Sequence, residues 1–265
     1  MKFSRRVIVF IAFLSLFLIL LCVFQNNRNQ KVKIVKEEGA IESENKKSFE
    51  DEQKLSEEES FEIVKEIQSS ENEKIKIPEK TFINVPFLSQ APFGEWDERH
   101  EEACEETSLI MMYYYLSGES LNAEVGEKEI QEMIDFQLEE YEDYRDSSAS
   151  ELVEIAREFY GMNELIVLYD FEKEDIKREL AKGNPVIIPA AGRLLGNPYY
   201  TQPGPLYHNM ILVGYEGDEI ISNDPGTRRG EGYRYDIDVL YNAVHDFTGN
   251  KEDILSGRKA MIVVE

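Results

Sequence analysis

The hydrophobic and polar positions divide the chain into three regions. Residues 7–24 are apolar without interruption except for Ser15. Residues 25–80 are dense in charge and poor in large apolar side chains, a composition that cannot bury enough surface to offset the entropy of ordering. From residue 81 onward, apolar residues recur at helical and strand spacings. The pattern therefore predicts an apolar segment, a charged spacer and one folded domain at 81–265.

Helical spacing recurs several times in the folded region. The first run is rich in apolar and aromatic residues and ends at Gly118, and another begins at Ser148, where Glu151 completes a capping box. We expect helices at 103–116, 126–141, 148–161, 172–183 and 236–247.

Shorter apolar runs bounded by turn residues predict strands at 81–88, 163–170, 185–192, 208–216, 219–224 and 260–265. Pro86 places the first of these at a sheet edge, because proline cannot donate to a ladder. A tight turn at Gly217 joins two of the strands into a hairpin. Since helices come first in the domain and antiparallel strands follow, the predicted fold class is α+β, with helices packed on an antiparallel sheet.

The apolar segment has the length of a membrane anchor. Its 18 residues span most of a hydrocarbon core about 30 Å thick, and no small residues mark a cleavage site at its end. Cys22 within it is an apolar filler, since the bulky Leu21 before it argues against lipidation. We expect residues 1–6 to be a cytoplasmic tail, 7–24 a single-pass anchor and 25–80 a stalk. The flanking charges nearly balance, so the export of the folded domain is inferred from its large size relative to the short tail.

Composition removes several function classes. The chain carries 53 acidic and 29 basic residues and a formal net charge of -24, so no basic stripe exists to bind nucleic acid. Two cysteines exclude a disulfide framework and a zinc cluster of the usual spacing. No P-loop or GxGxxG pattern is present, and nothing in the sequence calls for a metal or cofactor.

The only cysteine outside the apolar segment is Cys104, at the predicted start of a helix, whose positive end favours a thiolate. His208 opens a predicted strand, and Asp224 ends its hairpin partner, so the two side chains are expected to meet. This predicts that Asp224 orients His208 and that His208 is the base for Cys104. Gln90 lies shortly upstream and is expected to hold an oxyanion together with the backbone amide of Cys104.

Other assignments stay open. His100 lies four residues before Cys104 and is a rival base, although its charged surroundings predict a loop or surface position. Asn223 competes with Asp224, because neighbouring strand residues face opposite sides, and charge favours Asp224. His245 is expected to be structural. One group either holds a substrate carboxylate or pairs with local acids: Arg193, Tyr200, Arg228 and Arg229.

Taken together, these stretches resemble the C39-like cysteine peptidase family. The segments that carry the likeness are VPFLSQ at 85–90, Trp96, EEACEETSLIMMYY at 101–114, GNPVIIPAAGRLLGNPYY at 183–200, GPLYHNMILVGYE at 204–216 and ISNDPGTRRGEGYRY at 221–235. The likeness covers residues 82–265 in order. It implies a papain-like fold, a catalytic set matched by Cys104, His208 and Asp224, an oxyanion glutamine matched by Gln90, and a peptide or protein substrate.

The chain departs from the resemblance next to the cysteine. Many relatives have Gly-Pro there, whereas Glu105 and Glu106 follow Cys104 here, and Glu101 and Glu102 precede it. Carboxylates oppose a thiolate, although those that point into solvent are screened.

The expected function is a membrane-anchored cysteine peptidase that acts through a thioester. Two alternatives use the same cleft: a non-catalytic envelope module that binds peptides, and a transglutaminase-like acyl transferase.

Overall fold

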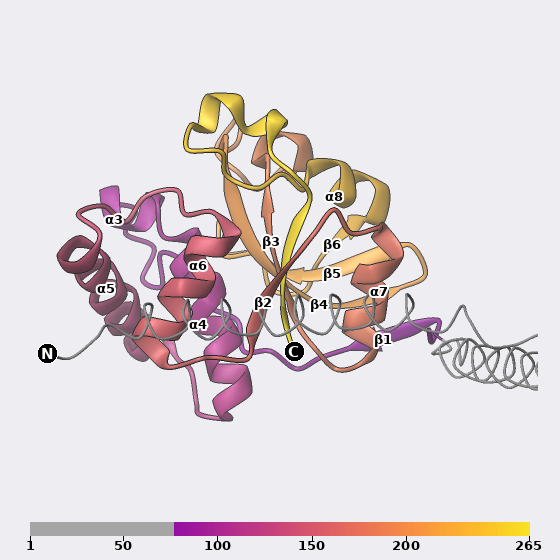
Figure 1. The fold of residues 1–265 in the computed structure, drawn as a ribbon, viewed down its shortest axis with the longest axis horizontal. Helices are drawn as coiled ribbons and strands as arrows, with labels where there is room; N and C mark the ends of the chain where they lie inside the picture. The colour runs from indigo at the N-terminus through magenta and orange to yellow at the C-terminus, as the bar shows by residue number, and fades with distance from the viewer. Residues whose placement is uncertain (1–76) are drawn as a thin grey trace, which may run out of the picture. The chain divides into compact units, whose positions relative to one another are not determined.

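The computed structural model describes residues 77–265. Its earlier residues form mainly helices and its later residues form most of a sheet (Figure 1). The helices are α3 (Glu98–Glu101), α4 (Cys104–Ser117), α5 (Ala123–Glu140), α6 (Ala149–Ile155), α7 (Lys173–Ala181) and α8 (Ile237–Ala243). Shorter turns are η1 (Ala156–Tyr160), η2 (Gly192–Leu195) and η3 (Lys251–Ser256). The strands are β1 (Lys80–Phe82), β2 (Leu165–Tyr169), β3 (Val186–Ala190), β4 (His208–Glu216), β5 (Glu219–Asn223), β6 (Tyr233–Asp236) and β7 (Ala260–Val264).

The sheet is antiparallel throughout. Its strand order is β2-β7-β3-β4-β5-β6, and β1 pairs with β4 beside a bulge between Leu212 and Gly214. Gly214 admits β1 because a side chain there would lie 2.4 Å from the carbonyl oxygen of Thr81. In Figure 1, helices α3 to α6 gather on one side of the domain, while α7 and α8 lie by the sheet. The predicted α+β class, with helices packed on an antiparallel sheet, is confirmed.

Helix α4 is the central helix of the domain. Leu109, Ile110, Met111 and Met112 are all fully buried, so residues 104–112 of the helix are enclosed on every side rather than along one stripe. It packs against β4 on one side and α5 on another. The first residue of this helix is Cys104, and its packing therefore fixes where the thiol lies.

Most helix ends follow their local signals. Gly118 and Gly161 adopt the left-handed conformation after their helices, and Ser148 forms the expected capping box with Glu151. Helix α5 begins three residues earlier than expected, because Asn122 caps it by accepting from the Val125 amide.

Two local predictions were wrong, and one strand was not predicted. The strand expected at 81–88 is only β1, because Pro86 has no donor and the segment leaves the sheet after Ile83, whose amide donates to Val213 O at 2.7 Å. Helix α8 was expected to end near residue 247 but ends at Ala243. The next residue, Val244, is extended and forms a β-bridge with Ala190. Strand β6 was not anticipated.

The anchor predicted at 7–24, the tail at 1–6 and residues 25–76 of the stalk lie outside the described residues and stay predictions. Within residues 77–265, none of the helices combines the length and apolar character that a bilayer crossing requires.

Candidate active site

The thiol of Cys104 lies at the first residue of α4. The preceding residue, Ala103, offers no side-chain cap, and the positive end of the helix favours a thiolate at this position, although Glu105 and Glu106 stand in the same first turn. Cys104 is only 7% exposed, yet it lines a cleft of about 700 Å³. Cys104 therefore borders the cleft although it is buried.

Two walls of different origin form the cleft. One comes from the helical side of the domain and includes Trp96, Glu101, Glu102 and Cys104. The other comes from the loops around β4 and β5 and includes Tyr199, Tyr200, Tyr207, His208, Gly226, Arg228 and Arg229. Gln90 lines the same cleft. The structure thus brings three of the predicted site residues, Cys104, His208 and Gln90, to one cavity.

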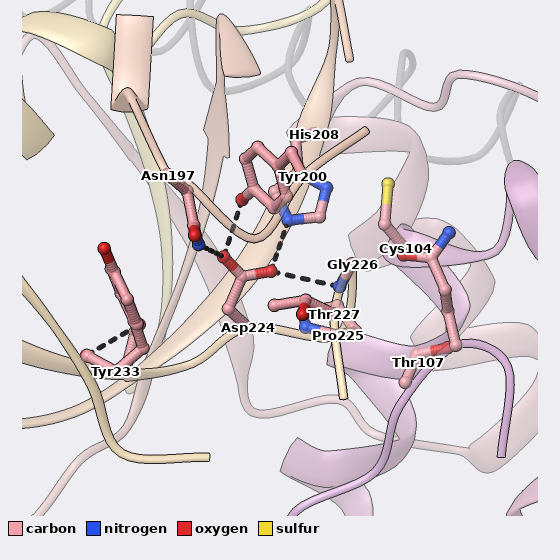
Figure 2. A network of polar contacts seen from close by, with 12 residues as sticks. Cys104, Thr107, Asn197, Tyr200, His208, Asp224, Pro225, Gly226, Thr227 and Tyr233 are labelled. Atoms are coloured by element: carbon pink, nitrogen blue, oxygen red, sulfur yellow. Dashed lines mark hydrogen bonds and ion pairs between the residues drawn. The ribbon is translucent and has the colours of Figure 1, made fainter. Parts of the chain in front are cut away.

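The hairpin of β4 and β5 brings His208 to Asp224. His208 is the first residue of β4, and Asp224 follows the last residue of β5. The ring Nε2 of His208 lies 2.8 Å from Asp224 Oδ1. In Figure 2 the imidazole lies between Asp224 and Cys104, with its other nitrogen directed toward the sulfur. The bond to Asp224 leaves Nδ1 as the nitrogen able to accept a proton.

Asp224 is surrounded by donors. Besides the His208 contact, Oδ1 accepts from the Gly226 amide at 3.0 Å. Oδ2 accepts from three side chains (Figure 2 shows those of Asn197 and Tyr200): Tyr200 Oη at 2.6 Å, Tyr235 Oη at 2.7 Å and Asn197 Nδ2 at 3.2 Å.

These partners determine the charge of the carboxyl group. Burial alone would raise the pKa of Asp224, but the charge of His208 and the bonds from His208, Tyr200 and Tyr235 outweigh burial and lower it. Asp224 is therefore a carboxylate at neutral pH.

The thiol itself has a different partner. Cys104 Sγ donates to Glu105 Oε2 at 2.9 Å, and in the described part of the chain no hydrogen bond joins it to His208. Burial, followed by the charge and hydrogen bond of Glu105, raises the pKa of Cys104 well above its ordinary value, against a smaller opposing effect of the Asn209 amide.

Two of the carboxyl groups next to Cys104 are buried, so solvent does not screen them as it would on the surface. Glu105 and Glu106 are 2% and 1% exposed, and burial raises the pKa of both. Glu101 is exposed and Glu102 is half-buried, beside Lys251. Two of the carboxyl groups therefore lie inside the protein, where water does not weaken their effect on the sulfur.

Gln90 is placed at the cleft but its amide is occupied. Its Nε2 donates to His100 O at 2.7 Å and to Glu101 O at 3.2 Å. These carbonyls end the short helix α3 and have no partner within it. An oxyanion would have to replace the longer of the two bonds.

His100 is buried, so its predicted loop or surface position was wrong. It lies in α3, and its two ring nitrogens contact Asp97 Oδ1 at 2.8 Å and Glu127 Oε2 at 2.9 Å. Burial works against its charge, but the carboxylates of Glu127 and Asp97 prevail and raise the pKa of His100. With both nitrogens engaged, His100 has none free to serve as base for Cys104.

Other open alternatives are settled by contacts. Asn223 does not meet His208, because its Nδ2 donates to Val85 O at 3.0 Å and its Oδ1 accepts from Gly232. His245 Nδ1 lies 3.0 Å from Gly257 O, which is a structural contact. Tyr200 donates to Asp224, which matches the second of its two alternatives, pairing with a local acid. The contacts of Asn197 and Tyr235 with Asp224 were missed, because no spacing in the sequence indicates them.

The arginines of the cleft do not pair with acids. Arg228 and Arg229 are exposed, and no ion pair involves either within residues 77–265. Arg229 lies over the Tyr199 ring, 4.9 Å from its centre, and Arg228 donates to Phe93 O at 3.4 Å. Arg193 donates to Gly204 O. Two guanidinium groups on the cleft are therefore free to meet an anion.

No arrangement of three or more His, Cys, Asp or Glu side chains suited to a metal ion occurs among the described residues.

No curated protein matches this chain. It is similar to a Bacillus anthracis protein assigned to the C39-like peptidases, with 18% identity and a TM-score of 0.47 over 71% of this chain and 98% of that one. It is also similar to a fragment of prointerpain A from Prevotella intermedia, with 12% identity and a TM-score of 0.43 over 86% of each chain. The model of the Peptidase_C39 like family matches residues 82–250, more than half of the chain, and the chain therefore belongs to this family.

Proposed function

We propose that this protein is a cysteine peptidase that hydrolyses amide bonds of peptides through Cys104. The observation that carries the proposal is the shared cleft of Cys104 and His208, in which the imidazole is bonded to a buried carboxylate. A carboxylate at Nε2 fixes the imidazole tautomer and stabilises the imidazolium that forms when Nδ1 takes a proton.

In the proposed reaction, His208 Nδ1 removes the proton of the Cys104 thiol, and the thiolate attacks the carbonyl carbon of the bound amide. The oxygen that becomes negative is held by the Cys104 amide and by Gln90, once Gln90 releases the carbonyl of Glu101. The imidazolium then gives its proton to the leaving amine. Water, deprotonated by His208, hydrolyses the thioester and restores the thiol.

A His208→Ala substitution tests the activated thiol. The full chain carrying Cys22→Ala has one thiol, so labelling by a thiol-directed peptide electrophile reports on Cys104 alone. Because a positioned base contributes about 10²–10⁴-fold, we expect the substitution to slow labelling by that order. His245→Ala, whose ring bonds a distant backbone carbonyl, is the control and should label at the parent rate. Equal labelling of parent and His208→Ala would refute the proposal.

The free guanidinium groups predict a preference for acidic peptides. An exposed ion pair contributes about 0.2–1 kcal/mol, so a peptide with a glutamate in reach of Arg228 and Arg229 should react roughly 1.4 to 5 times faster than its glutamine counterpart. The preference should shrink at high salt and vanish in the double variant Arg228→Gln/Arg229→Gln. A set of electrophilic peptides with glutamate or glutamine at each position measures it, and a preference that survives the double variant contradicts the assignment.

A second candidate is a peptide-binding module without turnover. The observation in its favour is the raised pKa of the Cys104 thiol, which keeps the sulfur protonated at rest. Peptide binding that persists in Cys104→Ser, together with a parent protein that neither cleaves nor labels, would select this candidate over the peptidase.

The proposal also places the enzyme at a membrane, tethered by residues 7–24 with the folded domain outside the cytoplasm. It rests on the uninterrupted apolar run in the sequence. Extraction of the full chain from membranes by alkali, without detergent, would contradict the tether.

A further inference from the structure

Glu105 is a buried carboxyl group in direct contact with the candidate nucleophile. Its Oε2 lies 2.9 Å from Cys104 Sγ. Its Oε1 is buried and has no hydrogen-bond partner within the described residues. A carboxylate with one oxygen orphaned in the interior loses a large hydration energy, whereas the neutral acid loses much less. The geometry thus suits a protonated Glu105 better than an ionised one.

The charges that surround Glu105 act in the same direction. Glu106 follows it on α4, and Asp146 approaches from the segment between α5 and α6; both oppose a negative charge on Glu105. Tyr207, which precedes β4, is also close to Glu105: burial, followed by the charge of Glu105, raises the pKa of the Tyr207 phenol. The cation beside Asp146, Lys251 of η3, pairs with Asp146 at 3.0 Å and with Glu102 at 3.3 Å. Burial, followed by Glu106, raises the pKa of Glu105 well above its ordinary value.

The reaction proposed above makes this contact decisive. Once His208 has taken the thiol proton, the sulfur is negative and remains 2.9 Å from the Glu105 oxygen. Two adjacent buried anions repel strongly, because little water screens them. If Glu105 keeps its own proton, the same contact becomes a hydrogen bond from the acid to the thiolate, which is a strong charge-assisted bond.

We propose that Glu105 is a catalytic residue of this site, which keeps its carboxyl proton during turnover and donates it as a hydrogen bond to the Cys104 thiolate. The inference rests on the proposed peptidase function and deepens it. In the activation step the S–H bond breaks and an N–H bond forms on His208 Nδ1, while the O–H bond of Glu105 stays intact. No oxidant or further reactant is needed. Glu105 offsets the burial that otherwise disfavours the thiolate.

Substitutions that keep or remove a donor test this role. In the Cys22→Ala background, Glu105→Gln retains an N–H that can face the sulfur, and we expect its labelling rate at neutral pH to stay within about fivefold of the parent. Glu105→Leu removes the donor and should slow labelling roughly 10- to 100-fold, the loss typical of a hydrogen bond to a charged group. If Glu105 only repelled the thiolate, Glu105→Leu would label faster than the parent, and this result would overturn the inference.

The pH dependence supplies a readout that a purely structural role would not change. The parent rate should fall as the pH rises through the raised pKa of Glu105, because the ionised group repels the thiolate and stops donating. Glu105→Gln should lack this alkaline fall. Glu106→Gln is the matched control: it removes the neighbouring buried carboxyl, whose Oε1 accepts from Gln137 at 2.6 Å, and should keep the fall. The same pH profile of labelling in the parent and in Glu105→Gln would refute the proposal. This test does not depend on whether Glu105→Leu folds.

The outcomes also separate this inference from the proposed function. Labelling that depends on His208 but is indifferent to Glu105 leaves the peptidase standing and removes the role of Glu105. A parent protein that does not label at any pH removes the peptidase function itself, and the role of Glu105 with it.

Discussion

Replacing Asp224 with asparagine is expected to lower the rate of thiol labelling and of peptide cleavage by about 10²–10⁴-fold. The reason is the direction of the hydrogen bonds. Tyr200, Tyr235 and Asn197 all donate toward Oδ2, so the amide oxygen of the asparagine must face them. Its NH₂ group then faces His208 Nε2, which becomes an acceptor.

The tautomer of His208 is thereby reversed. With Nε2 accepting, the ring proton lies on Nδ1, and this nitrogen can no longer take the proton of Cys104. The Gly226 amide, which donates to Oδ1 at 3.0 Å, loses its acceptor as well. The substitution therefore removes the base while leaving every side chain in place.

The matched control for this prediction is Asp246→Asn. Asp246 is also a buried carboxylate, but it accepts from the Ala149 amide at the start of α6, and within residues 77–265 its side chain forms no hydrogen bond with a histidine. The Asp246→Asn protein should be less stable than the parent and should label at the parent rate. A labelling rate in Asp224→Asn close to that of the parent would show that His208 does not depend on Asp224.

The pH dependence of stability gives an independent check on Asp224. Its pKa in the folded protein is lower than its ordinary value of 3.8. The stability that the carboxylate contributes is therefore complete above that ordinary value and is lost as the pH falls through the lower folded value. Asp224→Asn should lack this acid-side loss, which denaturation at a series of acid pH values would reveal.

The sequence could anticipate His208 and Asp224 because a hairpin is a local structure. Residues that open one strand and end its partner lie side by side whenever the turn between them is tight, as it is at Gly217. Helix α4 was likewise predictable, since its apolar residues are consecutive and Gly118 ends it. Both features depend on neighbours in the chain.

The rest of the site depends on contacts between distant segments. Two donors to Asp224, Asn197 and Tyr200, lie in the loop that follows η2, and the third, Tyr235, lies in β6. No periodicity in the sequence links these three residues. The burial of Glu105 was unexpected because glutamate is almost never fully buried without a partner. It follows from the enclosure of α4 on all sides, which leaves this helix no solvent-facing surface near its start. The sequence shows an apolar helix but not that its polar residues are enclosed too.

The enclosure of α4 also predicts the largest effect on stability. Leu109→Ala should lower the free energy of unfolding by about 2–5 kcal/mol, because the side chain is fully buried and its removal leaves a cavity between packed elements. Leu116→Ala changes the same residue type in the same helix at a position that is 37% exposed, and should cost less than about 1 kcal/mol. Chemical denaturation of the full chain, followed by far-ultraviolet circular dichroism, measures both. Equal losses in the two variants would mean that α4 does not form the centre of the domain, and the position of Cys104 would then lack the support on which the site depends.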